Sequence, residues 1–203
     1  MRFMRGLVGL IPMMAFVAGC VNNAPPAETK TAAAPAAAAA PAQSPVERGK
    51  YLTLVGGCND CHTPKKMGPN GPEADMSREL NGNPATDKVA PLPMRGKEIF
   101  TQWGTVASSN LTAWAGPWGV SFAMNLTPDK ATGLGSWTPE MFMAAIRTGK
   151  HQGTGRAILP PMPWYWYKSM TDDDLKAIFA YLQSLPPANN PIPDPLPPDK
   201  IPQ

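Results

Sequence analysis

The feature that most constrains this chain is the pentapeptide Cys58-Asn59-Asp60-Cys61-His62, in a sequence of 203 residues with three cysteines and two histidines. Over one turn of chain, two thiols can reach the two vinyl groups on one edge of a porphyrin. The residue directly after the second cysteine then carries an imidazole under the iron. The C-x-x-C-H spacing therefore predicts one haem c, attached covalently through Cys58 and Cys61, with His62 as an iron ligand.

Other uses of these residue types fit the sequence less well. A thioredoxin-like C-x-x-C lies in a βαβ setting, for which the sequence shows no pattern. A zinc site would need two more ligands, and His151 is the one remaining nitrogen donor. The formal net charge of +3, without a run of five basic residues, argues against nucleic acid as a partner.

The first nineteen residues have the composition of a secretory signal peptide. Arg2 and Arg5 precede an apolar run over residues 6–17, which is shorter than the ~20 residues of a membrane-spanning helix. The run ends in Val-Ala-Gly-Cys20, which resembles the lipobox of bacterial lipoproteins. We predict a lipoprotein signal peptide over residues 1–19 and acylation of Cys20. An ordinary cleavage site and a signal anchor are the alternatives.

The chain has 26 prolines, and the Pro-rich stretches mark the boundaries of three segments after the signal peptide. Residues 20–45 form the predicted lipid anchor and an Ala/Pro-rich tether, which has too few large apolar side chains to offset the entropy of ordering. Residues 46–185 are long enough for one core and are the predicted haem-binding domain. Residues 186–203 hold eight prolines and are predicted to form an extended tail.

Helix signals dominate the predicted core. Residues 47–55, 139–148 and 172–185 each carry an apolar face, with Thr138 and Thr171 as N-caps of the second and third helices. A short helix is expected around residues 97–103, and no convincing strand alternation is present. Residues 67–119 are rich in Gly, Pro, Asn and Trp and predict long loops, which a cofactor would organise. We therefore expect an all-α fold of three or more short helices and long loops around one haem.

The chain resembles a class I c-type cytochrome in three features: the C-x-x-C-H motif, a methionine in Pro160-Pro161-Met162-Pro163, and the terminal helix. Residues 125–137 and 145–149 further resemble the haem domains of cytochrome subunits of bacterial periplasmic alcohol-type dehydrogenases. The resemblance covers residues 46–189. Those subunits often carry several such domains and this chain has one C-x-x-C-H, so a dehydrogenase subunit and a freestanding carrier both remain open.

The second axial ligand is expected to be Met162. Flanking prolines fix its backbone, and it lies shortly before the final helix, where the family's ligand loop is found. Met124, Met170 and His151 are the other candidates. A soft thioether stabilises ferrous iron, so this ligation predicts a higher potential than two imidazoles would give.

The resemblance also implies supporting residues. The first and last helices should cross, with Gly49 allowing close approach of Tyr181. The Pro69 carbonyl is a candidate acceptor for the Nδ1–H of His62. Trp137 or Arg147 would hydrogen-bond a haem propionate, since a buried carboxylate needs such a partner. For Arg147, a solvated cation at a helix C-terminus is the equal alternative.

The expected function is single-electron transfer between redox proteins, on the dehydrogenase or oxidase side, at the periplasmic face of a bacterial membrane. No residue set is arranged for acid–base or nucleophilic catalysis, so we expect a carrier and not an enzyme. A haem enzyme with an open sixth iron position, and a sensor, are the alternatives. Binding of carbon monoxide to the reduced protein would favour the open position.

Overall fold

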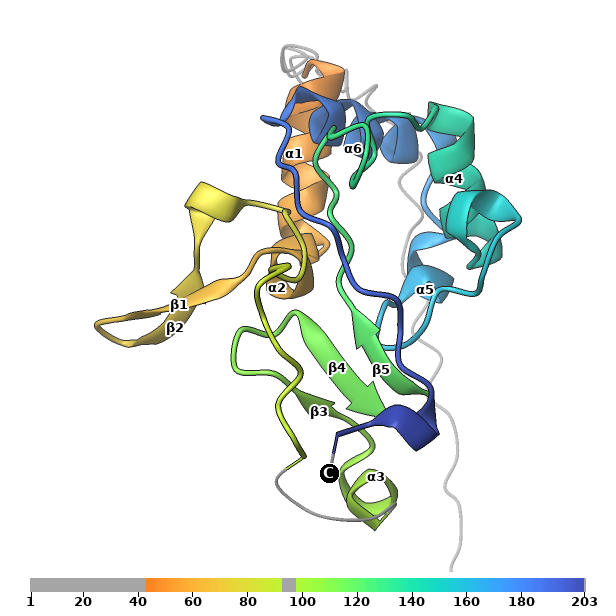
Figure 1. Cartoon of the computed structure of the whole chain (residues 1–203). Helices are drawn as coiled ribbons and strands as arrows, with labels where there is room; N and C mark the ends of the chain where they lie inside the picture. Colours follow the sequence, from red (N-terminus) through yellow and green to blue (C-terminus); the bar gives the residue numbers. More distant parts are fainter. Residues whose placement is uncertain (1–42, 93–97, 203) are drawn as a thin grey trace, which may run out of the picture. The chain divides into compact units, whose positions relative to one another are not determined.

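Helices at the two ends of the predicted domain pair with each other in the computed structural model, which describes residues 43–92 and 98–202 (Figure 1). The predicted signal peptide, the lipidation site Cys20 and nearly all of the tether lie outside these residues. Within the described part of the chain, no helix is long and apolar enough to cross a membrane.

Three longer helices carry the main core: α1 (Pro45–Val55), α4 (Pro139–Thr148) and α6 (Asp172–Ser184). The bounds of α4 match the prediction, and α6 ends one residue early. Helix α1 begins two residues earlier than predicted. Ser44 caps it, and the Ser44 and Glu47 side chains each bond the other residue's backbone N–H.

The pairing of α1 with α6 depends on a glycine. A Cβ at Gly49 would lie 1.9 Å from the Ala177 carbonyl oxygen and 2.8 Å from the Tyr181 Cβ. The two helices therefore touch backbone to backbone, as the resemblance implied. Around this contact lies a cluster of buried side chains from the three longer helices and two loops: Leu52, Leu80, Leu134, Phe142, Ile146, Leu175, Ile178, Phe179, Tyr181 and Leu182.

Shorter helices connect these elements. They are α2 (Cys58–His62), α3 (Glu98–Trp103) and α5 (Trp164–Tyr167). Helix α3 agrees with the short helix expected around residues 97–103. Helix α5 is anchored to the end of α1, because the Tyr167 hydroxyl donates to the Gly56 carbonyl at 2.6 Å.

Two small antiparallel sheets correct the all-α expectation. Strands β1 (Lys65–Gly68) and β2 (Gly71–Ala74) form a hairpin that extends away from the helices (Figure 1). Strands β3 (Val106–Ala107), β4 (Ala113–Gly116) and β5 (Gly119–Phe122) form a second sheet in that order. Each strand has at most four residues, which is too short to show a period of two in the sequence.

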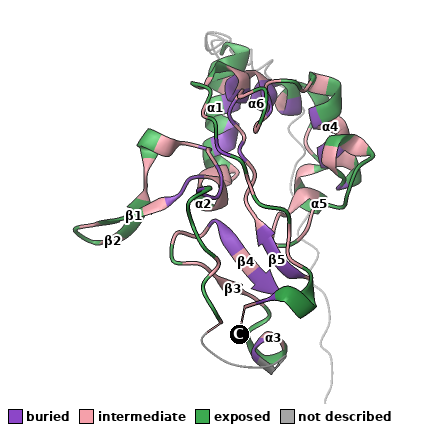
Figure 2. Cartoon of the chain, viewed as in Figure 1, coloured by how far each residue is buried: buried purple, intermediate pink, exposed green. Residues whose placement is uncertain are grey.

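The second sheet has its own buried cluster of Ala113, Ala115, Val120 and Ile201, distinct from the helical cluster (Figure 2). Ile201 comes from the Pro-rich C-terminal segment, which runs along the domain. Val120 and Leu196 exchange backbone hydrogen bonds of 2.8 and 3.0 Å. Asn190, also buried, donates to the carbonyls of Asn81 and Asn83. The segment is therefore an integral part of the second sheet's core.

Candidate haem-binding site

Helix α2 carries the three residues of the motif on one turn. Gly57 separates it from α1 and has φ +68°, a left-handed conformation that strains any residue with a side chain. The Lys65 ammonium group then caps the other end, donating to the carbonyls of Asn59, Asp60 and Thr63 at 2.9, 3.0 and 2.6 Å. Sequence analysis missed this cap, whose only sequence signal is a lysine three residues beyond the motif.

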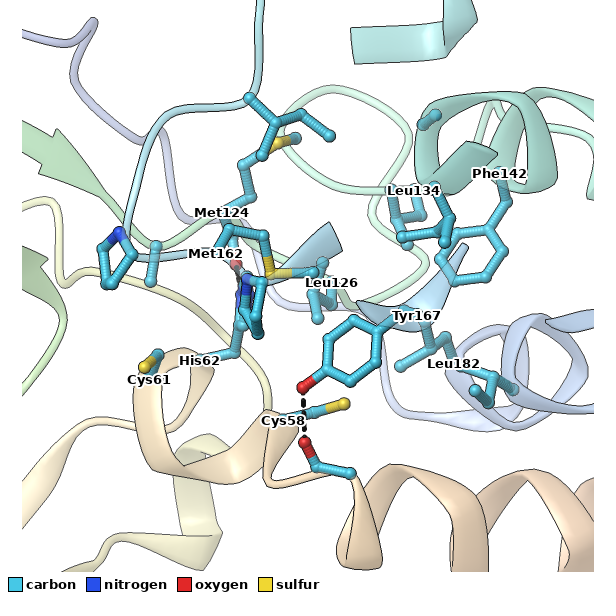
Figure 3. A pocket seen from close by; sticks show the side chains of 18 of the residues that line it. Cys58, Cys61, His62, Met124, Leu126, Leu134, Phe142, Met162, Tyr167 and Leu182 are labelled. Carbon is cyan, nitrogen blue, oxygen red and sulfur yellow. Dashed lines mark hydrogen bonds between the residues drawn. The ribbon is translucent and has the colours of Figure 1, made fainter. Parts of the chain in front are cut away.

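Cys58, Cys61 and His62 line one cavity of about 380 Å³ (Figure 3). Both cysteines are free, as thioether attachment requires. The opposite walls come mainly from apolar side chains of α4, α6 and the loops, among them Leu126, Leu134, Phe142, Ile146, Leu175, Ile178 and Leu182. Two thiols, an imidazole and apolar walls in one cavity are the donor set and surroundings that a covalently attached haem needs.

His62 is oriented by a backbone carbonyl. Its Nδ1 lies 2.8 Å from the Met124 carbonyl oxygen. Since a carbonyl only accepts, Nδ1 carries the proton and Nε2 keeps its lone pair for a metal. The expectation for Pro69 is wrong: Pro69 is an exposed residue in the turn between β1 and β2 and does not line the cavity.

Burial sets the protonation of the motif. It raises the pKa of the Cys58 thiol to about 11 and raises the pKa of Cys61 as well, with the Asp60 carboxylate adding to both shifts. Burial also lowers the pKa of His62, against the opposing effect of the Met124 carbonyl. The site therefore holds neutral thiols and a neutral imidazole.

All four candidates for the second axial position line the same cavity. Met162 and His62 both point into it (Figure 3), and Met124, Met170 and His151 also contribute to its walls. Pro161 and Pro163 line the cavity on either side of Met162. The His151 ring packs edge-on against Trp137, with the ring centroids 5.0 Å apart. His62 and the four candidates for the second ligand therefore lie around one cavity, and lining the cavity does not by itself distinguish among the four.

The two predicted propionate partners lie in different places. Trp137 lines the cavity, whereas Arg147 does not. Arg147 donates to the Lys168 carbonyl and forms an ion pair with Asp172 at 2.6 Å, so it ties α4 to the start of α6. In the part of the chain that the structure describes, the arginine that lines the cavity is Arg156. Sequence analysis missed it, because nothing in the pattern separates it from a loop cation.

A zinc site receives no support from the geometry. Among residues 43–92 and 98–202, no group of three or more His, Cys, Asp or Glu side chains could hold a metal ion.

Comparisons with known proteins agree with this site. The cytochrome c family model matches residues 46–186. The chain is 30% identical over 136 residues to the gluconate 2-dehydrogenase cytochrome c subunit of Pantoea cypripedii, covering 67% of this chain and 22% of that protein. It is 28% identical over 139 residues to the fructose dehydrogenase cytochrome subunit of Gluconobacter japonicus, covering 68% and 21%.

A third relative is the cytochrome c subunit of the quinone-type alcohol dehydrogenase of Gluconobacter oxydans (strain 621H), 27% identical over 136 residues, covering 67% and 20%. The chain thus spans about a fifth of the length of each of these relatives. The motif, the cavity that it lines and the family match lead to one conclusion: the chain belongs to the cytochrome c family and is an electron-transfer cytochrome that binds haem c covalently.

Proposed function

We propose that this protein carries single electrons through a haem whose iron is held by His62 and Met162. We further propose that it works at the periplasmic face of a bacterial membrane and exchanges electrons with a dehydrogenase. The observation that carries the ligand pair is that both side chains point into the cavity that the two thiols line (Figure 3).

The surroundings of the candidates favour Met162 over the alternatives. The Met124 carbonyl is the hydrogen-bond partner of His62 Nδ1, which puts the backbone of Met124 on the side of the imidazole that faces away from the metal-binding Nε2. His151 is packed against Trp137. Met170 and Met162 both pack against the helical core cluster, so this packing does not separate them. Met162 belongs to a loop whose flanking prolines fix the backbone and reduce the entropy lost on ligation.

The bound haem supplies an iron that alternates between the ferric and ferrous states. The protein's own residues hold that group and set its electronic surroundings. The apolar walls keep water away, and the Met162 thioether favours the ferrous state. Trp137 and Arg156 are the candidates to bind the propionates, because they are hydrogen-bond donors on the wall of a largely apolar cavity.

Membrane tethering rests on the amino-terminal sequence. An acylated Cys20 followed by about 25 extended residues would hold the domain up to several tens of Å from the lipid surface, at ~3.1 Å per residue. Labelling with a fatty acid should mark the unmodified protein and leave the Cys20→Ala variant unmarked. Unmodified protein without label would remove the lipid anchor from the proposal.

The partner class follows from the relatives, which are named as cytochrome subunits of gluconate, fructose and alcohol dehydrogenases. We propose that a periplasmic dehydrogenase delivers the electrons. Isolation of the native protein from membranes with its bound partners tests this directly, and purification as a free carrier would instead favour a diffusing role.

The ligand pair is tested by replacing Met162 with Ala and, as a matched control, Met170 with Ala, since both methionines line the cavity. The Met162 variant should lose the far-red charge-transfer band of the ferric protein, show a lower midpoint potential and bind carbon monoxide when reduced. The Met170 variant should keep the band. A band that persists without Met162, or ready carbon monoxide binding by the unmodified protein, would falsify the ligation.

A further inference from the structure

We infer that strand β5 and the residues that follow it position both proposed axial ligands, and that Ser121 positions Met162 through the Pro160 carbonyl. The inference rests on the ligand pair proposed above. Its two contacts lie three residues apart on one stretch of backbone. The Ser121 hydroxyl donates to the Pro160 carbonyl at 2.5 Å, and the Met124 carbonyl accepts from His62 Nδ1 at 2.8 Å.

Ser121 is a buried member of a strand, with 8% of its surface exposed. Its hydroxyl has a second acceptor within reach, the Trp114 carbonyl at 3.4 Å, but the bond to Pro160 is far shorter and takes the single hydroxyl proton. Among the described residues, this is the side-chain hydrogen bond that reaches residues 159–163. The segment that carries Met162 is therefore attached to β5 at one defined point.

The support behind Ser121 is rigid on both sides. Strand β5 pairs with β4 along its whole length, and its Val120 exchanges two hydrogen bonds with Leu196 of the C-terminal segment. Gly119 lies so close to that segment that a Cβ there would stand 1.9 Å from the Leu196 carbonyl oxygen. The backbone of β5 cannot shift without moving the sheet or the C-terminal segment.

The continuation of β5 toward Met124 is held in the same way. The Ala123 N–H donates to the Thr112 carbonyl at 2.8 Å, and the Ala123 carbonyl accepts from the Asn83 N–H at 2.9 Å. Next to Asn83, the Gly82 N–H donates to the His62 carbonyl at 2.8 Å. The same framework thus holds the backbone of His62, the proton on its ring and the loop of Met162.

A thioether is a weak ligand for ferric iron, which prefers harder donors, so Met162 depends on being held in place. Loss of the Ser121 hydroxyl removes one attachment of its loop and increases the fraction of time that Met162 is away from the iron. A competing ligand then binds more readily. The quantity that reports this is the affinity of the ferric protein for imidazole, which must displace Met162 to bind.

The test uses the haem-loaded protein with Ser121→Ala, together with Ser121→Thr, which retains a hydroxyl. Ser108→Ala is the matched control: Ser108 bonds Asn110 and the Ala113 N–H at the start of β4, in the same sheet, and does not line the haem cavity. Ser121→Ala should bind imidazole about five- to tenfold more tightly than the unmodified protein, the effect of one lost hydrogen bond. Ser121→Thr should restore the original affinity, and Ser108→Ala should lower stability to denaturant without changing imidazole binding.

Met162→Ala, measured in parallel, separates the two ideas. If it changes neither the far-red band nor imidazole affinity, the ligand pair itself is wrong and this inference goes with it. If Met162→Ala changes both but Ser121→Ala binds imidazole as the unmodified protein does, the ligand pair stands and the positioning role of Ser121 is overturned. An equal gain in affinity for Ser108→Ala would also overturn it, because general loosening of the sheet would then explain the effect.

Discussion

Replacement of Gly49 by Ala should separate the helix pair on which the main core depends. The added Cβ would stand 1.9 Å from the Ala177 carbonyl oxygen and 2.8 Å from the Tyr181 Cβ. Ordinary non-bonded contacts are about 3.5 Å, so the two helices must move apart by about 1 Å or more. Both obstructing atoms are backbone or directly attached to it, and no side-chain rotation can relieve the clash.

The magnitude follows from two opposing effects. Alanine in a helix interior is favoured over glycine by up to ~1 kcal/mol. Overpacking a well-packed contact costs about 1–3 kcal/mol, and more where the neighbours cannot rotate away. We expect the free energy of unfolding to fall by about 2 kcal/mol, which for a domain of this size lowers the melting temperature by roughly 4–8 °C.

The assay is guanidinium unfolding of the haem-loaded protein, followed by circular dichroism. Lys50→Ala is the control, since Lys50 is the exposed neighbour on the same helix and its replacement should change stability by less than about 0.5 kcal/mol. A Gly49→Ala protein as stable as the unmodified one, or more stable, would refute the close backbone contact.

Two further perturbations probe the cavity wall and a loop. Arg156→Gln should lower the midpoint potential by about 40 mV in a redox titration, because losing one screened positive charge worth ~1 kcal/mol favours the ferric state. Arg147→Gln is the control: it removes the same charge outside the cavity and should shift the potential by less than half as much. Equal shifts would contradict the assignment of Arg156 to the cavity wall. The Thr132 hydroxyl and N–H hold the pKa of the Asp129 carboxyl below its usual value, a stabilisation present above the unfolded pKa of ~3.9 and lost as pH falls through the lower folded value. Asp129→Asn should therefore melt at a lower temperature at neutral pH, with the gap to the unmodified protein narrowing toward about pH 2; a gap that does not change with pH would count against this reasoning.

Features written in local sequence could be predicted. Thr138 and Thr171 cap α4 and α6 as expected, because a cap needs only a hydroxyl and the backbone three residues on. The C-x-x-C-H spacing also predicted that the two thiols and the imidazole would line one cavity. This was possible because all three groups lie on one turn of helix.

Features that depend on tertiary pairing could not be predicted. The strands of the second sheet are short, and β5 pairs with β4 and, through Val120, with the distant Leu196. The acceptor for His62 is a carbonyl 62 residues away, on Met124, where local reasoning looked to nearby Pro69. Arg147 and Arg156 look alike in the sequence, and the ion pair of Arg147 with Asp172 is what separates them.

The crossing of α1 with α6 has a kinetic consequence. These helices lie near opposite ends of the described chain, so the contact at Gly49 closes a loop that contains most of the described residues. Closing so large a loop is entropically costly, and topologies dominated by distant contacts fold slowly. Since α6 supplies Leu175, Ile178 and Leu182 to the wall of the haem cavity, Cys58 and Cys61 should be more accessible before the α1–α6 contact closes than after it.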